Sequence, residues 1–597
     1  MNALEVRRKI LETVSRNGGH LASSLGAVEI AMALRQVFDP GKDRIVWDVG
    51  HQAYAWKILT DRADKFPTLR KLDGISGFPN PMESRCDAAI AGHAGTALSV
   101  AEGLAAARDR KGTDEHVVAV IGDASIANGT SFEAINNCAA ATKRLIVVLN
   151  DNEMSIAKPV GSFAKGLGRL TSGERYNRFK NIAKRIGRSL RLSFLYGFVH
   201  WVKMRLKTMM LMDTWFEDFG LHYLGPVDGH DVAALVSALS AAKAEDRPVL
   251  LHVVTKKGHG FGPAEKDPTA WHGVGPFPYP AAHDNIDLAL PTDGQSEPPP
   301  PCWSDVFGRA LCEIAEEDGR IVALTAAMRD GTGLGGFASK FPGRFFDVGI
   351  AEGHMVAFAG GLAAGGMRPV VAVYSTFLQR AVDQVMHDVA IANLPVVVCV
   401  DRAGVVGADG VTHQGLYDIA MLRCLPNVTI CQPKDADDLK ALLKEAMGRN
   451  GPTVIRYPRG KAPVGKGAGD VRHAACDSSC AAAVDENGRR GAIWATGDWY
   501  GKACEVAGRI GWVAVHARYI KPFDAKLLAL QRAAGMKIAS LENGSVAGGL
   551  GEAIGADYKF GWPDEFIPHG TQSELERRYG LDVESLVARL SALESKQ

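Results

Sequence analysis

The chain has 597 residues, which at the usual size of folded domains is enough for roughly three or four domains. Its content of 46% hydrophobic and 23% charged residues is that of an ordinary soluble globular protein. The formal charge of +1 gives no overall attraction to nucleic acid or to an anionic membrane, so we expect neither as a partner.

Cysteine usage and the N-terminus both indicate a cytoplasmic protein. None of the ten cysteines forms a Cys-x-x-Cys pair, and the closest two, Cys476 and Cys480, lie in a low-complexity stretch. Reduced thiols in the cytosol are the simplest interpretation. The first twenty residues begin an amphipathic helix without a long apolar core or cleavage site, so we predict no signal peptide.

The N-terminal region brings three histidines into similar surroundings. Helical patterns cover residues 3–37 with a glycine-rich break at 17–20, and a strand near 45–47 leads into a loop. His20, His51 and His93 each follow a glycine, where the backbone can approach a ligand closely. This context leaves open both a polar binding site and three structural histidines.

Two buried strands with polar ends stand at the centre of the first half of the chain. The apolar run Val117–Gly122 is typical of a strand buried on both faces, and Asp123 follows it. After a helical pattern, a second run at Leu145–Leu149 leads to Asn152, 29 positions after Asp123. A right-handed crossover would place both polar ends at one edge of a parallel sheet, where such sheets bind ligands. They would then suit a Mg²⁺ ion holding a diphosphate; an ordinary βαβ unit is the alternative.

A basic stretch follows. Residues 175–207 contain ten Lys or Arg and no acidic residue, interleaved with aromatic side chains. A helix on a membrane surface is one interpretation. The other is an amphipathic cover over a pocket, which the lack of a second membrane anchor favours. The apolar run 192–202 is too short to span a bilayer.

Two breaks divide the rest of the chain. Residues 283–303 lack periodicity and include four consecutive prolines, which indicates a semi-rigid linker, and a second break rich in glycine and alanine covers about 461–489. In the second domain we predict strands at Ile321–Thr325, Phe345–Val348, Val370–Tyr374, Val396–Val400 and Val428–Cys431, with helices at Gly353–Gly365 and Phe377–Ile391. A third series runs from a strand at Ala492–Trp494 to a helix at Val583–Leu593. We therefore predict an α/β protein of three domains, 1–284, 304–462 and 490–597, joined by linkers at 285–303 and 463–489.

Seven sequence words carry a resemblance to one family. They are Asp48–Tyr54, Leu149–Ile156, Gly225–Asp231, Tyr374–Arg380, Asp401–Gly404, Gly407–Gly415 and Arg456–Gly460. In these words and in their order the chain resembles the 1-deoxy-D-xylulose-5-phosphate synthase family of transketolase-like thiamine diphosphate enzymes, over nearly its full length. The stretch from Asp123 to Asn152 also resembles the thiamine diphosphate motif, with Ala124 in place of its second glycine.

The resemblance implies an architecture and a reaction. Two parallel-sheet domains would bind the diphosphate and the pyrimidine of thiamine diphosphate, followed by a smaller transketolase C-terminal-like domain, in a homodimer. The cofactors would be thiamine diphosphate and Mg²⁺. The substrates would be pyruvate and D-glyceraldehyde 3-phosphate, in the first step of the non-mevalonate isoprenoid pathway, which also feeds thiamine and pyridoxal synthesis.

The resemblance also implies roles for matching positions. The metal ligands would be Asp123, Asn152 and the carbonyl of Met154. The cofactor would be lined by His51, Gly92, His93, Ala94, Asp123, Ala124, Ser125, Asn152, Phe261, Glu352 and Phe377. The catalytic groups would be Glu352, His20, His51, His413, Arg380 and Asp409, and the substrate ligands Ser23, Tyr374, Arg402 and Arg459.

These residue types suit the chemistry. The thiazolium ring stabilises a carbanion that no side chain can stabilise, while the protein orients the reactants. A buried Glu352 would activate the pyrimidine ring; a surface carboxylate at a helix N-terminus is the alternative. Arginines pair with phosphate and carboxylate, and histidines move protons near neutral pH.

Four positions depart from the family pattern: Ala124 for glycine, Gly353 for glutamine, Phe261 for tyrosine, and His93–Thr96 for a serine-rich loop. They bear on cofactor affinity and rate more than on the type of reaction. Two other functions stay open: a transketolase, which transfers a ketol unit without decarboxylation, and a non-catalytic paralogue that binds the cofactor. Tyr374–Arg380 favours the synthase, and the retained Asp123 and Glu352 favour catalysis.

Overall fold

The computed structural model describes residues 1–152, 213–279, 301–463 and 490–594. They belong to two compact units, which are described separately: residues 1–69 with 74–292, and residues 70–73 with 293–597. Most of both predicted linkers, the basic stretch and Met154 lie outside the described residues.

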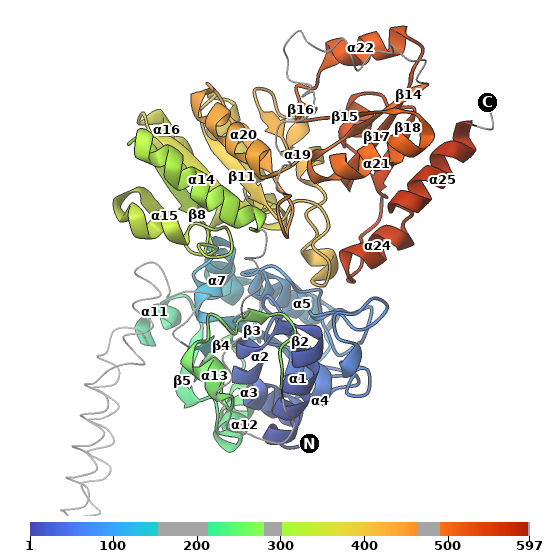
Figure 1. Ribbon diagram of the computed structural model, residues 1–597. Helices are drawn as coiled ribbons and strands as arrows, with labels where there is room; N and C mark the ends of the chain where they lie inside the picture. Colours follow the sequence, from blue (N-terminus) through green and yellow to red (C-terminus); the bar gives the residue numbers. More distant parts are fainter. Residues whose placement is uncertain (153–212, 280–300, 464–489, 595–597) are drawn as a thin grey trace, which may run out of the picture. The chain divides into compact units, whose positions relative to one another are not determined.

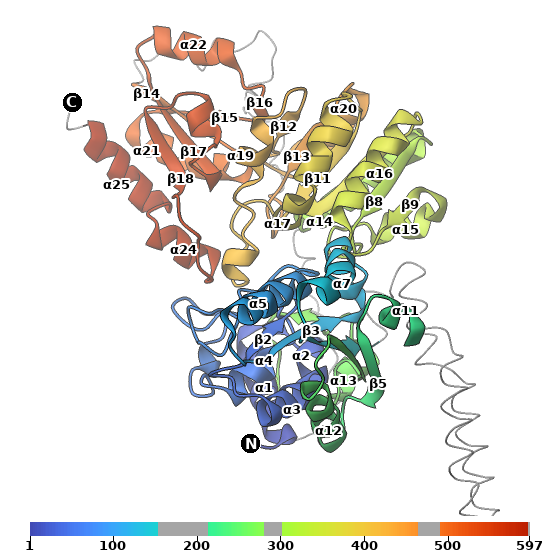
Figure 2. The same cartoon turned by 180° about the vertical axis from the view of Figure 1, so that it is seen from behind.

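A five-stranded parallel sheet forms the centre of the first unit (Figures 1 and 2). Its order is β2-β3-β4-β6-β5, with bounds Arg44–Trp47, Val117–Gly122, Ile146–Asp151, Val249–Val254 and His222–Asp228. The main helices are α1 (Ala3–Asn17), α3 (Val28–Val37), α4 (Tyr54–Leu59), α5 (Ala97–Lys111), α7 (Gly129–Ala141) and α12 (Val232–Lys243). The shorter elements are β1 (Gly19–His20), paired with β7 (Gly273–Val274), and α2 (Ala22–Gly26), α6 (Asp123–Ile126), α11 (Asp213–Asp218) and α13 (Gly262–Lys266).

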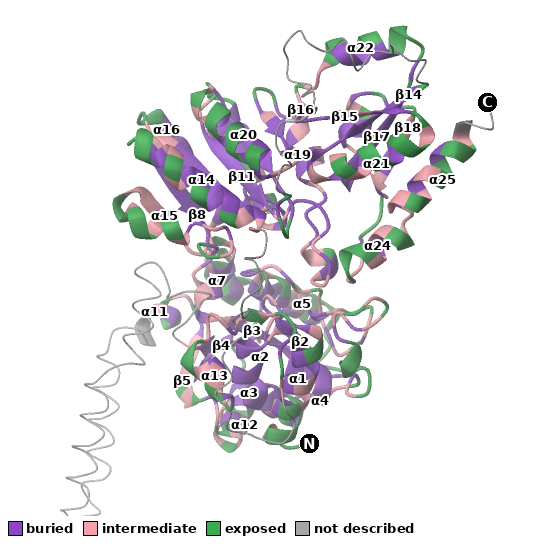
Figure 3. Cartoon of the chain, viewed as in Figure 1, coloured by how far each residue is buried: buried purple, intermediate pink, exposed green. Residues whose placement is uncertain are grey.

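Strand β3 shows why its apolar run predicts the layers correctly. Val118 and Val120 enter a core with α1, α3, α4 and α12, whereas Val117, Ala119 and Ile121 enter a second core with α5 and α7. Both faces of the sheet are therefore covered, as the buried strands in Figure 3 show. A strand without a polar face is the pattern that such a three-layer arrangement requires.

The second unit contains a seven-stranded sheet. Its order is β16-β12-β13-β11-β10-β8-β9, with bounds Tyr519–Lys521, Thr429–Cys431, Thr453–Arg456, Val397–Asp401, Arg368–Tyr374, Ile321–Thr325 and Phe345–Asp347. Helices α14 (Trp303–Glu317) and α20 (Ala436–Gly448) cover one face and α16 (Glu352–Ala364) the other. All pairings are parallel except that of the edge strand β16.

A four-stranded parallel sheet completes this unit, in the order β15-β14-β17-β18, with bounds Val513–His516, Gly491–Ala495, Lys537–Ser545 and Tyr558–Trp562. The remaining helices are α15 (Gly335–Lys340), α19 (Asp418–Arg423), α21 (Tyr500–Ile510), α22 (Ala525–Ala533), α23 (Leu550–Ala553), α24 (Gln572–Arg578) and α25 (Val583–Glu594). One apolar core includes Trp494 and Ile538 from this sheet and Val371 and Val398 from the larger sheet. A shared core and the edge strand β16 unite the two sheets, and the division into three domains stays a prediction.

One predicted element differs from the structure. The helix expected at Phe377–Ile391 is divided into α17 (Ser375–Leu378), a 3-10 turn, α18 (Val382–Gln384) and a π-helical turn at Val385–Ala390. The backbone of Ala381, at φ −127° and ψ 10°, leaves the α-helical region and interrupts the hydrogen-bond ladder. Over the described residues, every helix is too short or too polar to cross a bilayer.

Candidate active site

The polar ends of β3 and β4 lie at one edge of the sheet, as predicted. Asp123 begins α6 directly after β3, and Asn152 follows β4, whose Asn150 is in register with Gly122 of β3. Asp123 is buried, and the Oδ1 atom of Asn152 is buried without a hydrogen-bond partner among the described residues. A buried carboxylate and an unsatisfied amide oxygen at the same edge fit a hard cation.

A buried lysine opposes this carboxylate. Burial, and then Asp151, raise the pKa of Asp123 to about 7, against the effect of Lys257. Burial lowers the pKa of Lys257, which follows β6, to about 8, and Asp123 opposes that shift. The edge of the sheet thus carries a carboxylate, Asp123, that can bind a cation, and an ammonium group, Lys257, that can bind an anion. Lys257 is not among the site residues predicted from the sequence.

Three histidine rings gather next to this edge. The ring centroids of His20 and His51 are 6.1 Å apart, and the ring of His272 lies 5.6 Å from that of His20 and 5.4 Å from that of His51. Ser23 Oγ lies 3.4 Å from His272 Nδ1. Burial, followed by neighbouring cations that include Lys257, holds the pKa of His51 and of His272 well below its usual range. Both rings are therefore kept neutral, and each has one nitrogen that can accept a hydrogen bond and one that can donate.

His272 is a residue that sequence reasoning missed. His20, His51 and His93 each follow a glycine, whereas His272 precedes one, Gly273. The antiparallel pairing of His20 with Gly273 explains why it reaches the cluster from a distant part of the chain. A glycine on either side of a histidine is the sequence signal that these four residues share.

Asp48 fixes the loop that contains Gly92, His93 and Ala94 by accepting hydrogen bonds from the backbone that follows it. The buried carboxylate of Asp48 accepts N–H bonds from Gly95 at 2.9 Å and from Ala97 at 3.1 Å, and so ties the loop to the end of β2. Gly95 has φ +82°, and a Cβ there would lie 2.6 Å from the side chain of Asn128. Only glycine fits this position without strain. Ala124 and Ser125 lie in α6.

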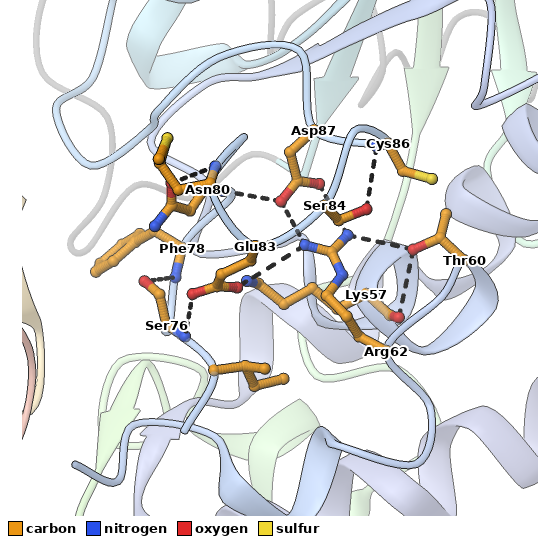
Figure 4. Close-up of polar contacts among 12 residues, drawn as sticks. Lys57, Thr60, Arg62, Ser76, Phe78, Asn80, Glu83, Ser84, Cys86 and Asp87 are labelled. Atoms are coloured by element: carbon orange, nitrogen blue, oxygen red, sulfur yellow. Dashed lines mark hydrogen bonds and ion pairs between the residues drawn. The ribbon is translucent and has the colours of Figure 1, made fainter. Parts of the chain in front are cut away.

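A buried ion-pair network holds the segment that precedes this loop (Figure 4). Arg62 pairs with Asp87, and Lys57 donates to Glu83 at 2.8 Å. Asp87 also accepts the N–H of Asn80 at 2.8 Å, so the network connects the chain after α4 to the segment 76–87. Phe78 in that segment lies 5.5 Å from the ring of His20.

In the second unit, Glu352 is the first residue of α16 and is only 4% exposed. The alternative of a surface carboxylate is therefore wrong. Burial raises the pKa of Glu352, and Arg380, whose Nη1 lies 3.7 Å from Oε2, opposes this rise. A carboxyl group that is kept out of water in this way can hold a proton for exchange.

Aromatic rings and arginines surround the ends of β10 and β11. The Phe377 ring stacks on the Tyr374 ring, with centroids 6.0 Å apart. The His413 ring contacts the Phe377 ring edge-on, with centroids 5.7 Å apart. Arg402 lies over the Tyr374 ring, with Cζ 3.8 Å from its centroid. The structure thus brings these four predicted site residues together.

Asp409 lies between two further arginines. Arg70 Nη1 donates to its Oδ1 at 2.5 Å, and Arg459 Nη1 lies 3.7 Å from its Oδ2. Burial, and next the charge of Arg402, lower the pKa of Arg459. Arginines that repel one another around a single carboxylate form a site for an anion such as phosphate. Sequence reasoning missed Arg70, which lies far from the rest of this cluster in the chain.

Phe261 packs edge-on against Trp271, with ring centroids 5.2 Å apart, in the apolar core of the first unit. Its contact with the cofactor stays a prediction, as does the role of Met154.

Comparison with known proteins gives the family. A profile described as 1-deoxy-D-xylulose-5-phosphate synthase matches residues 1–255, and one described as the transketolase pyrimidine-binding domain matches residues 300–464. The 1-deoxy-D-xylulose-5-phosphate synthase 2 of Geobacter sulfurreducens is 43% identical, over 100% of this chain and 96% of its own. The chain belongs to the 1-deoxy-D-xylulose-5-phosphate synthase family. The synthase of Desulforudis audaxviator is 45% identical, over 98% of this chain and 93% of its own.

A transketolase from Leishmania mexicana is similar at 17% identity, with a TM-score of 0.44, over 100% of this chain and 98% of its own. Membership of the synthase family implies thiamine diphosphate as cofactor and an enzyme of the transketolase type. It confirms the synthase interpretation of the sequence over the transketolase and the non-catalytic one.

Proposed function

We propose that the chain condenses pyruvate with D-glyceraldehyde 3-phosphate, with loss of CO₂, through the residues described above. The observation that carries this assignment is the buried carboxyl group of Glu352 at the start of α16, in a chain related to the synthases over its whole length. When bound, thiamine diphosphate supplies the carbon that attacks the keto group of pyruvate and holds the electron pair that CO₂ leaves behind.

The first unit would hold the charged end of the cofactor. Asp123 and Asn152, with the carbonyl of Met154, would bind Mg²⁺, and the unsatisfied Oδ1 of Asn152 supports this choice. Lys257 would pair with the diphosphate, because its ammonium group is buried next to Asp123, at the edge of the sheet where the diphosphate would bind.

The second unit would orient the ring and the substrates. Glu352 would exchange a proton with the pyrimidine ring, and Phe377 would stack on it. Tyr374, Arg402 and Arg459 would hold the phosphate or carboxylate of the substrates, and we propose the same role for Ser23 of the first unit. His413 would move protons in this unit, as His20, His51 and His272 would in the first unit. Arg380 and Asp409 would orient the reacting groups.

We further propose a homodimer, the three domains given above and a cytoplasmic location, for which the cysteine usage is the support. The reaction is the first step of the non-mevalonate isoprenoid pathway, and its product also feeds thiamine and pyridoxal synthesis.

A coupled assay tests the function. The purified chain with Mg²⁺ and thiamine diphosphate should release CO₂ and form 1-deoxy-D-xylulose 5-phosphate in equal amounts from pyruvate and the aldehyde. Glu352→Gln serves as control, since it preserves the shape of the side chain and removes its proton exchange, and should lower kcat by about a hundredfold or more. Ketol transfer between sugar phosphates without CO₂ would refute the proposal.

A further inference from the structure

The loop after β6 carries Lys257 into the candidate site, and its backbone is tightly constrained. Gly258 and Gly260 have φ of +79° and +82°, and a Cβ on either would lie under 3 Å from Ala264 or Arg7. The N–H of Gly258 also donates to the carbonyl of Ala22 at 2.8 Å. The direction in which Lys257 points therefore depends on how both ends of this loop are held.

His230 holds the first end. The backbone N–H of Lys256 donates to His230 Nε2 at 2.8 Å, so this nitrogen must carry a lone pair. The proton of the neutral ring then lies on Nδ1, which is 3.2 Å from Oε2 of Glu29. His230 comes from the Gly225–Asp231 word, to which the sequence analysis assigned no role.

Arg7 holds the other end. Its Nη2 donates to Oε2 of Glu29 at 2.7 Å, and its Nε donates to the carbonyl of His259 at 2.9 Å. The ring of His259 stacks on that of His230 with centroids 3.7 Å apart. Although burial alone would raise it, the hydrogen bonds from His230 and Arg7 lower the pKa of Glu29 to about 2. Its carboxylate is thus ionised and joins both ends of the loop.

The same residues are close enough to suggest a metal site, since ligand atoms of Glu29, His230 and His259 lie within 4.8 Å of one another. The hydrogen bonds argue against it. Both ring nitrogens of His230 already have partners, and the Arg7 guanidinium already neutralises Glu29. A metal ion would have to displace a buried cation.

We propose that His230 is a positioning residue, which through the N–H of Lys256 fixes the loop that presents Lys257 to the diphosphate of thiamine diphosphate. This inference rests on the proposed function, because it presupposes that Lys257 contacts the cofactor. It assigns His230 no contact with the cofactor itself.

A double-mutant cycle tests the proposal. Dissociation constants of thiamine diphosphate, at saturating Mg²⁺, are measured by calorimetry for the unmodified chain, His230→Ala, Lys257→Met and the double variant. His230→Ala leaves the Lys256 N–H without its acceptor and should weaken binding about tenfold. In the Lys257→Met background the same change should alter binding by less than about twofold, because the group that it positions is absent.

Two further variants separate positioning from general damage. His230→Gln retains an acceptor for the Lys256 N–H and should recover most of the affinity, which keeps the test valid if His230→Ala unfolds. His222→Gln is the control, since His222 is a half-buried histidine of the same unit, 2.9 Å from Glu217, and should leave binding unchanged. If His230→Ala lowered the affinity for thiamine diphosphate equally in the unmodified chain and in Lys257→Met, the role of His230 would be overturned and the proposed function would stand. Unchanged affinity in Lys257→Met would overturn the role of Lys257 as well.

Discussion

Individual ionisable residues in both units are kept away from water. The pKa of Asp123 is raised to about 7, that of Lys257 is lowered to about 8, and burial raises that of Glu352. Keeping such groups buried costs folding free energy, and functional sites are where proteins accept this cost. At this scale each group has a distinct role that a single substitution can test.

Asp123→Ala should abolish Mg²⁺-dependent binding of thiamine diphosphate. Without the carboxylate, the ion has no anionic ligand at the end of β3 to balance the diphosphate. Calorimetric titration with and without Mg²⁺ measures this, and thermal unfolding checks the fold. A variant with normal affinity would contradict the assignment of the metal ligand.

Arg459→Ala should raise the KM for D-glyceraldehyde 3-phosphate about ten- to a hundredfold, because one charge-assisted hydrogen bond to the phosphate is lost. The KM for pyruvate should change little, and an unphosphorylated aldehyde should become a relatively better substrate. The Arg459 side chain is 48% exposed, so its removal should leave no large cavity in the unit. Arg320→Ala, at an exposed arginine of the same unit paired with Asp318, is the matched control. Equal increases for both substrates would show that Arg459 supports the cofactor or the fold instead.

Among the elements, the segment 76–87 shows how a loop without regular structure is held in place. Its ion pairs with Lys57 and Arg62 are buried, and both of these cations are almost fully excluded from solvent (Figure 4). The segment leads directly into the loop with His93. The position of that loop therefore depends on charges outside the set of predicted site residues.

Asp87→Ala should destabilise the chain by about 3–5 kcal/mol, because it leaves the Arg62 guanidinium buried without its main partner. Asp114→Ala, which breaks the exposed pair with Lys42, should leave the free energy of unfolding nearly unchanged, because solvent screens this pair. Urea unfolding followed by tryptophan fluorescence compares the two. Similar losses for both variants would mean that the buried pair contributes no more than a surface pair.

The whole molecule is expected to be a homodimer. The glycine- and alanine-rich part of α16, around Phe358–Gly366, would permit close packing across a twofold axis. In the same unit, Met386 and Ile391 are 49% and 68% exposed, which is unusual for large apolar side chains that lie so near each other in sequence.

Light scattering at micromolar concentration should therefore give twice the chain mass of 63.8 kDa. Ile391→Asp should shift this equilibrium toward the monomer, whereas Lys440→Asp, at an exposed position of α20, should not. A monomer with full activity would contradict the proposed assembly.

The sequence by itself determined the features that depend on residues close together in the chain. The two strands with polar ends, the helix at Val28–Val37 and the motif words follow from apolar periodicity and from short runs of residues. These patterns were sufficient to predict the α/β class, the family, and the placement of Asp123 and Asn152 at one edge of a parallel sheet. They could not reveal the interruption at Ala381, because it is a change in backbone φ and ψ within a run that contains no glycine or proline to mark a break.

Only the tertiary structure decided which distant residues complete the two groups of site residues. Lys257 reaches Asp123 through the loop after β6, and His272 reaches His51 through the pairing of β1 with β7. Arg70 meets Asp409 across more than three hundred residues. Strand β16 likewise joins the larger sheet from the far side of the predicted boundary. A side chain's partners and its pKa are set by burial and by charges that approach only after folding, which no local pattern contains.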